Sequence, residues 1–85
     1  MPKPIRLSHH AETVMRERGL DRDWIVRAIE EPEWSEQDPS DSEVERRYRT
    51  IPERNGRIIR VACVETPREI IIVSAFLDRG ARRPK

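Results

Sequence analysis

Two mostly apolar runs in the second half of the sequence constrain the fold most strongly. Residues 57–65 read RIIRVACVE and residues 69–77 read EIIIVSAFL, so apolar side chains occupy both faces of each expected strand. Strands of this kind are usually central in a sheet and covered on both sides. Only 35% of the residues are hydrophobic. We therefore expect these runs to supply much of one modest core, in one domain over residues 1–85.

A third strand is expected at residues 46–51, RRYRTI, where β-forming residues alternate with arginines. Asn55-Gly56 between this run and the next is a hairpin signal. A two-residue turn would place Pro52 where the ladder requires an N–H, whereas a three-residue loop over residues 54–56 turns Pro52 outward. The sequence therefore favours the three-residue loop. The expected pairs are then Thr50 with Arg60 and Tyr48 with Ala62.

Two helices are expected before the strands. Ser8 is a suitable N-cap for a helix from about His9 to Arg18, which Gly19 can end in a left-handed conformation. Asp21 caps a second helix that Pro32 prevents from continuing. The apolar positions are Leu7, Ala11, Val14 and Met15 for the first helix, and Trp24, Ile25, Ala28 and Ile29 for the second. The pattern predicts an α+β fold, with two N-terminal helices packed on an antiparallel sheet of three to four strands.

Residues 30–45, EEPEWSEQDPSDSEVE, contain 8 acidic residues, two prolines and three serines. This composition is typical of a loop, with Trp34 either packing on the core or stacking on a base. Charge is divided unevenly, since residues 1–45 carry a net −6 and residues 46–85 a net +7. The two halves could dock on each other, meet in a homodimer, present a basic face to an anionic partner, or form an ordinary solvated surface.

No apolar run approaches the length of a membrane span, and the first ten residues lack the apolar core of a secretion signal. The single cysteine, Cys63, cannot form an internal disulfide. We therefore expect a cytoplasmic protein. The sequence lacks a glycine-rich phosphate loop and metal-ligand spacing, and neither a cofactor nor a metal is predicted.

Arg60 is the most informative polar residue because it interrupts an apolar strand. A guanidinium there needs a carboxylate, a carbonyl or an anionic ligand. An ion pair with the acidic segment and a phosphate-binding role both remain open. Other arginines of the basic half suit phosphate through planar, bidentate donation, although they equally suit protein carboxylates. The candidates for binding nucleic acid are Arg47, Arg49, Arg57 and Arg82.

Two further side chains could take part in proton transfer. His10 lies at the start of the first helix, at the edge of its apolar face, where it is either a general base or a polar surface residue. Tyr48 lies among the arginines and could donate a proton, stack on a base, or simply pack beside the sheet.

Several short segments resemble a family of small bacterial domains of unknown function. These segments are His10-Ala11, Met15, Arg18-Gly19, Ile29-Glu30-Glu31-Pro32 and Phe76-Leu77-Asp78-Arg79. That family is similar to the RelE-like toxins, including the BrnT type, which are small ribonucleases paired with antitoxins. The resemblance implies a RelE-like fold, a surface that cleaves RNA and a cognate antitoxin protein as partner.

The first functional hypothesis is a metal-independent endoribonuclease of a toxin–antitoxin system. Such cleavage needs a base at the 2′-hydroxyl, cations for the developing charge and an acid for the leaving oxygen. His10 would be the base or acid, Arg60 and Arg79 would stabilise the phosphate, and Tyr48 would support proton transfer. The alternative is a non-catalytic module that uses its arginine-rich sheet to bind nucleic acid or an acidic protein.

Overall fold

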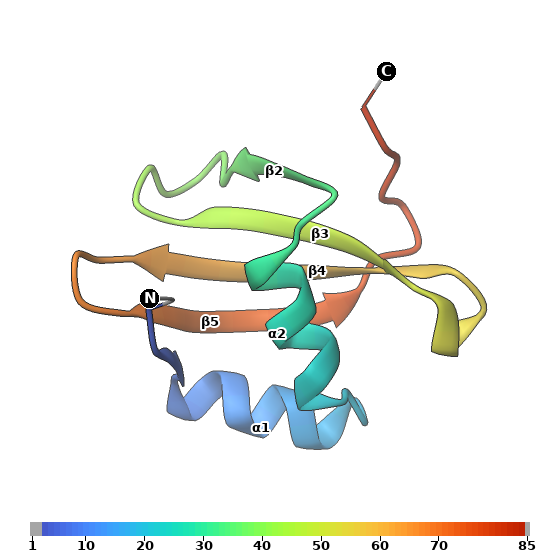
Figure 1. The fold of residues 1–85 in the computed structure, drawn as a ribbon, viewed down its shortest axis with the longest axis horizontal. Helices are drawn as coiled ribbons and strands as arrows, with labels where there is room; N and C mark the ends of the chain where they lie inside the picture. Colours follow the sequence, from blue (N-terminus) through green and yellow to red (C-terminus); the bar gives the residue numbers. More distant parts are fainter. Residues whose placement is uncertain (1–2, 85) are drawn as a thin grey trace.

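The computed structural model describes residues 3–84 and contains one sheet with two helices (Figure 1). The elements in chain order are β1 (Ile5–Leu7), α1 (His9–Glu17), α2 (Arg22–Glu30), β2 (Trp34–Gln37), β3 (Glu45–Ile51), the 3-10 turn η1 (Pro52–Arg54), β4 (Arg57–Glu65) and β5 (Ile70–Leu77). The strand order is β1-β5-β4-β3-β2. β1 runs parallel to β5, while the other neighbours are antiparallel.

The α+β class and the two helices are confirmed, but the predicted antiparallel sheet of three to four strands is wrong. The sheet is mixed and five-stranded. β1 is too short to show alternation in the sequence, and its partner lies far along the chain, with Ile5 opposite Ile70. Neither the local hydrophobic pattern nor a turn signal predicts such a long-range pairing. Leu7 was therefore predicted to lie on the apolar face of the first helix.

β2 arises within the acidic segment that was expected to be a loop. Glu36 lies opposite Arg46 of β3. Opposite charges on facing positions stabilise a pair of strands. The weak β-propensity of this segment is therefore offset by the basic strand beside it.

The hairpin between β3 and β4 also differs from the prediction. Tyr48 lies opposite Arg60, and Ile51 opposite Arg57, so the loop spans residues 52–56 rather than 54–56. Pro52 begins the 3-10 turn, and Asn55 and Gly56 follow with φ values of 57° and 74°. The two-residue change in register preserves which face each side chain occupies, because faces alternate with a period of two.

The helices begin and end at the predicted signals. The Ser8 hydroxyl accepts from Ala11 N at 3.1 Å, and the Asp21 carboxylate accepts from Asp23 N at 2.8 Å. Gly19 closes α1 with φ of 63°. None of the helices in residues 3–84 has the length and apolarity that a bilayer crossing requires.

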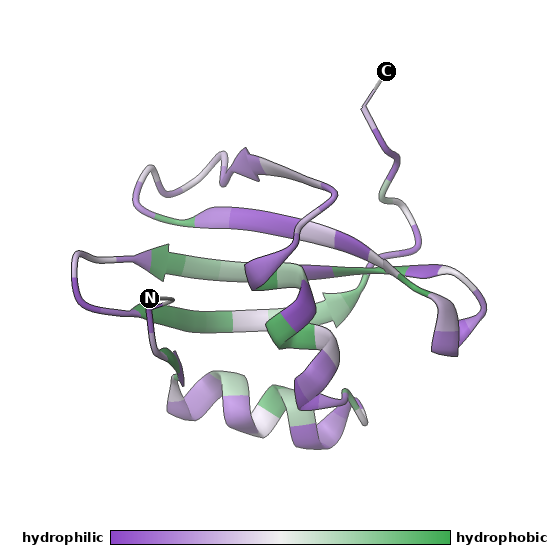
Figure 2. Cartoon of the chain, in the orientation of Figure 1, coloured by the Kyte–Doolittle hydropathy of each residue, from purple (hydrophilic) through white to green (hydrophobic). Residues whose placement is uncertain are grey.

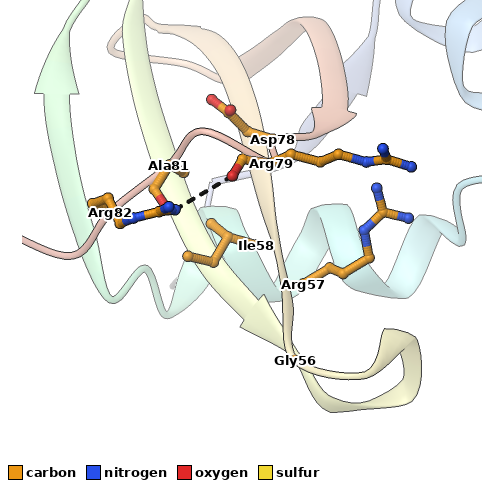
Figure 3. A pocket seen from close by; sticks show the side chains of 7 residues that line it. All are labelled: Gly56, Arg57, Ile58, Asp78, Arg79, Ala81 and Arg82. Carbon is orange, nitrogen blue, oxygen red and sulfur yellow. Dashed lines mark hydrogen bonds between the residues drawn. The ribbon is translucent and has the colours of Figure 1, made fainter.

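Both helices cover the same face of the sheet, and the core lies between the two layers (Figures 1 and 2). The largest fully buried side chains there are Ile25, Ile51, Ile59, Val61, Cys63 and Ile72. No helix of the described chain covers the other face, which we call the open face. The segment after β5 crosses this open face, on the opposite side of the sheet from α2 (Figure 3).

Candidate anion-binding site

A row of four side chains crosses the open face. Trp34, Tyr48, Arg60 and Phe76 stand on neighbouring strands in direct register. Phe76 joins the row because a bulge in β5 opposite Ala62 and Cys63 exchanges the faces of that strand. The row therefore consists of two neighbouring rings, one cation and a third ring.

Aromatic rings hold the row in place. The rings of Trp34 and Tyr48 are stacked, with centroids 4.6 Å apart and planes inclined by 7°. The Arg60 guanidinium carbon lies 4.1 Å from the centroid of Phe76, a cation–π contact. Tyr48 is only 3% exposed, whereas Trp34 is partly exposed. Trp34 therefore packs on Tyr48 outside the main core, and its ring keeps an accessible part.

The carboxylate that faces Arg60 belongs to Asp78, just after β5, and not to the acidic segment. Arg60 Nη1 lies 3.5 Å from Asp78 Oδ2. The same carboxylate also accepts from the backbone N–H of Gly80, at 2.9 Å. Arg60 thus shares the Asp78 carboxylate with the backbone N–H of Gly80. The Arg60 side chain also lines a cavity.

This cavity, which we call the tyrosine cleft, has a volume of about 320 Å³. Its walls are Trp34, Glu36, Arg46, Tyr48 and Arg60 from the sheet, together with Asp78, Gly80, Ala81 and Arg82. The Tyr48 hydroxyl donates to Glu36 Oε1 at 2.7 Å. Burial, together with this hydrogen bond, raises the pKa of Tyr48. The hydroxyl therefore stays protonated at neutral pH, as a proton donor must.

A second cavity of about 390 Å³, the arginine pocket, lies beside the tyrosine cleft where the chain leaves β5 (Figure 3). It is lined by Gly56, Arg57, Ile58, Asp78, Arg79, Ala81 and Arg82. Arg57 and Arg79 extend to the same side of the pocket, while the Asp78 carboxylate points away from them. Arg82 donates to the carbonyl oxygens of Arg79 and Ala81, at 3.3 and 3.1 Å.

None of Arg57, Arg79 and Arg82 forms an ion pair within residues 3–84. A guanidinium offers five fixed donors that match phosphate or carboxylate oxygens. The arginines of this pocket therefore have no carboxylate partner within the described residues, and the pocket can bind an anion.

Arg47 and Arg49 lie on the other side of β3, toward the helices. Arg47 Nη1 donates to Ile29 O at 3.0 Å, and Arg49 Nη1 donates to Glu31 O at 2.5 Å. These carbonyls end α2, where a cation also interacts favourably with the helix dipole. The two arginines cap a helix on the covered face, and neither lines the arginine pocket.

His10 is exposed on α1, in the helical layer. The tyrosine cleft lies on the open face, so the sheet separates His10 from Arg60. Of the predicted residues, the structure brings together Tyr48, Arg60 and Arg82 in the cleft, and Arg57, Arg79 and Arg82 in the adjoining pocket.

Sequence reasoning missed Glu36, Arg46 and Asp78 as cleft residues. The polar composition of the acidic segment hid the strand that positions Glu36, although the alternation of β3 placed Arg46 on the face of Tyr48. Asp78 gave no signal, because a carboxylate following a strand resembles ordinary surface. Within residues 3–84 no three His, Cys, Asp or Glu side chains lie close enough together to hold a metal ion.

Comparison with protein families matches residues 7–77 to a family described as Domain of unknown function (DUF4258). Neither the curated proteins nor the solved structures that were compared include a match to this chain.

Proposed function

The chain belongs to this DUF4258 family, whose description assigns no activity, and we propose from its two adjoining cavities, the arginine pocket and the tyrosine cleft, that it is a binding module for single-stranded RNA. The observation that carries the proposal is the set of guanidinium groups in the arginine pocket, which lack a carboxylate partner within residues 3–84. Phosphate contacts supply most of the affinity of nucleic-acid-binding proteins, and arginine is suited to them.

The tyrosine cleft supports single-stranded rather than double-stranded RNA. It adjoins the arginine pocket, since Asp78, Ala81 and Arg82 line both. The partly exposed Trp34 offers a ring on which an unpaired base can stack. Such stacking contributes about 1–3 kcal/mol per base and requires a base that is not held in a duplex.

Fluorescence anisotropy with a labelled 12-nucleotide RNA at a series of salt concentrations tests this proposal. The double variant Arg57→Ala/Arg79→Ala is expected to weaken binding at least tenfold. It should also reduce the dependence of log K on log salt by about 1.4, because single strands contribute about 0.7 per phosphate contact.

Arg68→Ala is the matched control. It removes one charge from the turn between β4 and β5, where the Arg68 side chain is exposed and forms no ion pair within residues 3–84. A loss of log K in Arg68→Ala about half as large as that in the double variant would show that only net charge matters. Absence of binding at 50 mM salt would contradict the proposal outright.

One observation favours a second function, metal-independent cleavage of RNA. Glu36, Tyr48, Arg46 and Arg60 line the same cleft, where Glu36 Oε1 accepts from the Tyr48 hydroxyl and lies 4.0 Å from Arg46 Nη1. Glu36 would take the proton of the 2′-hydroxyl as this oxygen attacks phosphorus. Arg60 would stabilise the developing charge, and Tyr48 would protonate the leaving 5′-oxygen. A cyclic phosphate and a 5′-hydroxyl end would result.

A relationship to RelE-like or BrnT-type toxins, an antitoxin partner and action in the cytoplasm belong to this second proposal. RNA incubated with the protein in a chelator should be cut, and Tyr48→Phe, which keeps the ring stack, should slow cutting about a hundredfold. His10→Ala tests the separate assignment of the histidine, because the sheet separates it from the cleft. RNA that stays intact would leave only the binding function.

A further inference from the structure

A third hollow, which we call the edge pocket, lies at the outer edge of β5 and has a volume of about 480 Å³. It is lined by Arg18, Leu20, Arg54, Arg57, Phe76 and Leu77. Cavities of about 300–1,000 Å³ are the usual size for small-molecule sites. The functions proposed above assign no role to it.

The edge pocket has an apolar floor and a basic rim. Leu20, Phe76 and Leu77 form the floor, because β1 pairs only with residues 70–72 and leaves the rest of that edge of β5 without a strand partner among residues 3–84. At this edge a hydrogen bond from the Arg18 side chain replaces one that a neighbouring strand would make. Arg18 Nη1 donates to Ala75 O at 2.9 Å, and the Arg18 guanidinium carbon lies 5.5 Å from the centroid of Phe76.

The rim contains three guanidinium groups and no carboxylate. Arg54 lies over the ring of Trp24, at 5.7 Å from its centroid, which holds the cation in place. Within residues 3–84, Arg18, Arg54 and Arg57 form no ion pair. An apolar floor beneath fixed cations fits a flat ring that carries an anion.

Arg57 lines both the edge pocket and the arginine pocket. On the arginine-pocket side, Arg57 and Arg79 extend together (Figure 3). We infer that the two pockets together bind one nucleotide at the end of an RNA strand, its base over the Phe76 floor and its phosphomonoester between Arg57 and Arg79. This inference rests on the proposed binding function and names the strand end as the part recognised.

A terminal phosphate suits this position better than an internal one. A phosphomonoester carries about −1.5 to −2 charge at pH 7 and three terminal oxygens, whereas a phosphodiester carries one charge. Two arginines without carboxylate partners can each donate two N–H groups to such oxygens. The arginine pocket therefore has the charge and the donors that the monoester requires.

The two tryptophans provide separate reporters for the test. Trp24 lies beneath Arg54 beside the edge pocket, and Trp34 lines the tyrosine cleft. Titration of ¹⁵N-labelled protein with adenosine monophosphate should shift the indole signal of Trp24 and leave that of Trp34 in place. Adenosine alone and inorganic phosphate alone should each bind at least tenfold more weakly.

Three tetranucleotides then separate the possible sources of the phosphate: one with a 5′-phosphate, one with a 3′-phosphate and one with neither. We expect one phosphorylated form to bind about tenfold more tightly than the unphosphorylated strand. Arg79→Ala should remove that preference, and the control Arg68→Ala should keep it, with thermal unfolding confirming that both variants are folded.

Equal affinities for the three strands, together with no response to adenosine monophosphate, would overturn the inference and leave RNA binding itself intact. If no strand binds, the proposed function and the inference both fail. A shift of the Trp34 signal instead of the Trp24 signal would place the nucleotide in the tyrosine cleft and overturn the assignment to the edge pocket.

Discussion

Two groups of arginines in this protein differ in what neutralises them. Arg47 pairs with Glu65 at 2.6 Å and with Glu45, and Arg46 pairs with Asp38 at 3.1 Å. Arg57, at the start of β4, and Arg79, just after β5, form no ion pair within residues 3–84. The net charge of the basic half therefore overestimates the number of positive side chains that are available to a partner. Much of that charge binds the protein's own acidic residues.

The paired group joins parts of the chain that are distant in sequence. Arg46 binds the segment after β2, and Arg83 pairs with Glu33, just before β2. Arg47 links β3 to β4 and to the end of α2. The docking of acidic on basic segments, one of the interpretations of the charge asymmetry, therefore occurs within one chain.

The largest expected effect comes from Arg47→Ala. The Arg47 side chain is 13% exposed, and its removal leaves Ile29 O without its side-chain donor and the Glu65 carboxylate with Lys3 alone. We expect a loss of about 2 kcal/mol in the free energy of unfolding, measured by urea denaturation. Arg57→Ala should change it by less than about 0.5 kcal/mol. Similar losses in both variants would break the distinction between the two groups.

The next largest effect is expected at acid pH, where protonation of the carboxylates should weaken the ion pairs of the paired arginines. Hydrogen bonds from Ser40, and then from Arg46, lower the pKa of Asp38 to about 2, and Arg27 lowers that of Glu53 to about 2. Because these values lie below those of the unfolded chain, their contribution to stability is present above about pH 4.5 and is lost as the pH falls toward 2. Melting temperatures should therefore fall over that range. Asp38→Asn/Glu53→Gln should melt lower at pH 6 and depend less on pH, and an unchanged slope would contradict these pairings.

Asp78→Asn should leave Arg60 without a carboxylate partner within residues 3–84 and so add it to the group of unpaired arginines. The change removes the carboxylate charge 3.5 Å from Arg60 and keeps an oxygen for the Gly80 N–H. Removing one negative charge from a basic site should tighten RNA binding about threefold to fivefold at low salt, measured by anisotropy. Weaker binding would show that Asp78 orients Arg60 rather than competing for it.

The smallest effect is expected for Arg83→Ala. The side chains of Arg83 and Glu33 are 63% and 26% exposed, and exposed ion pairs contribute about 0–1 kcal/mol. The free energy of unfolding should change by less than about 0.5 kcal/mol. Hydrogen exchange at Gly80 and Arg82 should nevertheless become faster, because this ion pair ties the segment after β5 to Glu33, just before β2. Unchanged exchange would show that the contact holds nothing in place.

Local signals predicted much of the fold. Ser8, Gly19 and Asp21 predicted the helix ends, because capping interactions act within a few residues. The apolar runs predicted β4 and β5. β1 and β2 escaped notice because each is short and depends on a partner strand. The hairpin register was missed because Pro52 enters a 3-10 turn instead of continuing the strand.

The candidate site was predictable only in part. Arg60 was identified because a charge inside an apolar strand must be satisfied, and Tyr48 shares its face. Arg47 and Arg49 alternate in step with the buried Ile51, so the two-residue period of β3 already placed them on the covered face. The contact between Arg60 and Phe76 depends on the bulge in β5, which no pattern in the sequence marks.

The parallel pairing of β1 with β5 has a consequence for synthesis on the ribosome. β5 lies between β1 and β4 and is the last of the strands in residues 3–84 to be synthesised, so Ile5 cannot pair until Ile70 has been made. The two helices are made early, yet the apolar surface they cover forms only when β4 and β5 are complete. Pairings this distant in the chain slow folding and leave nascent apolar segments exposed. A nascent chain halted before β5 would therefore carry helices without a core, an expected substrate for chaperones.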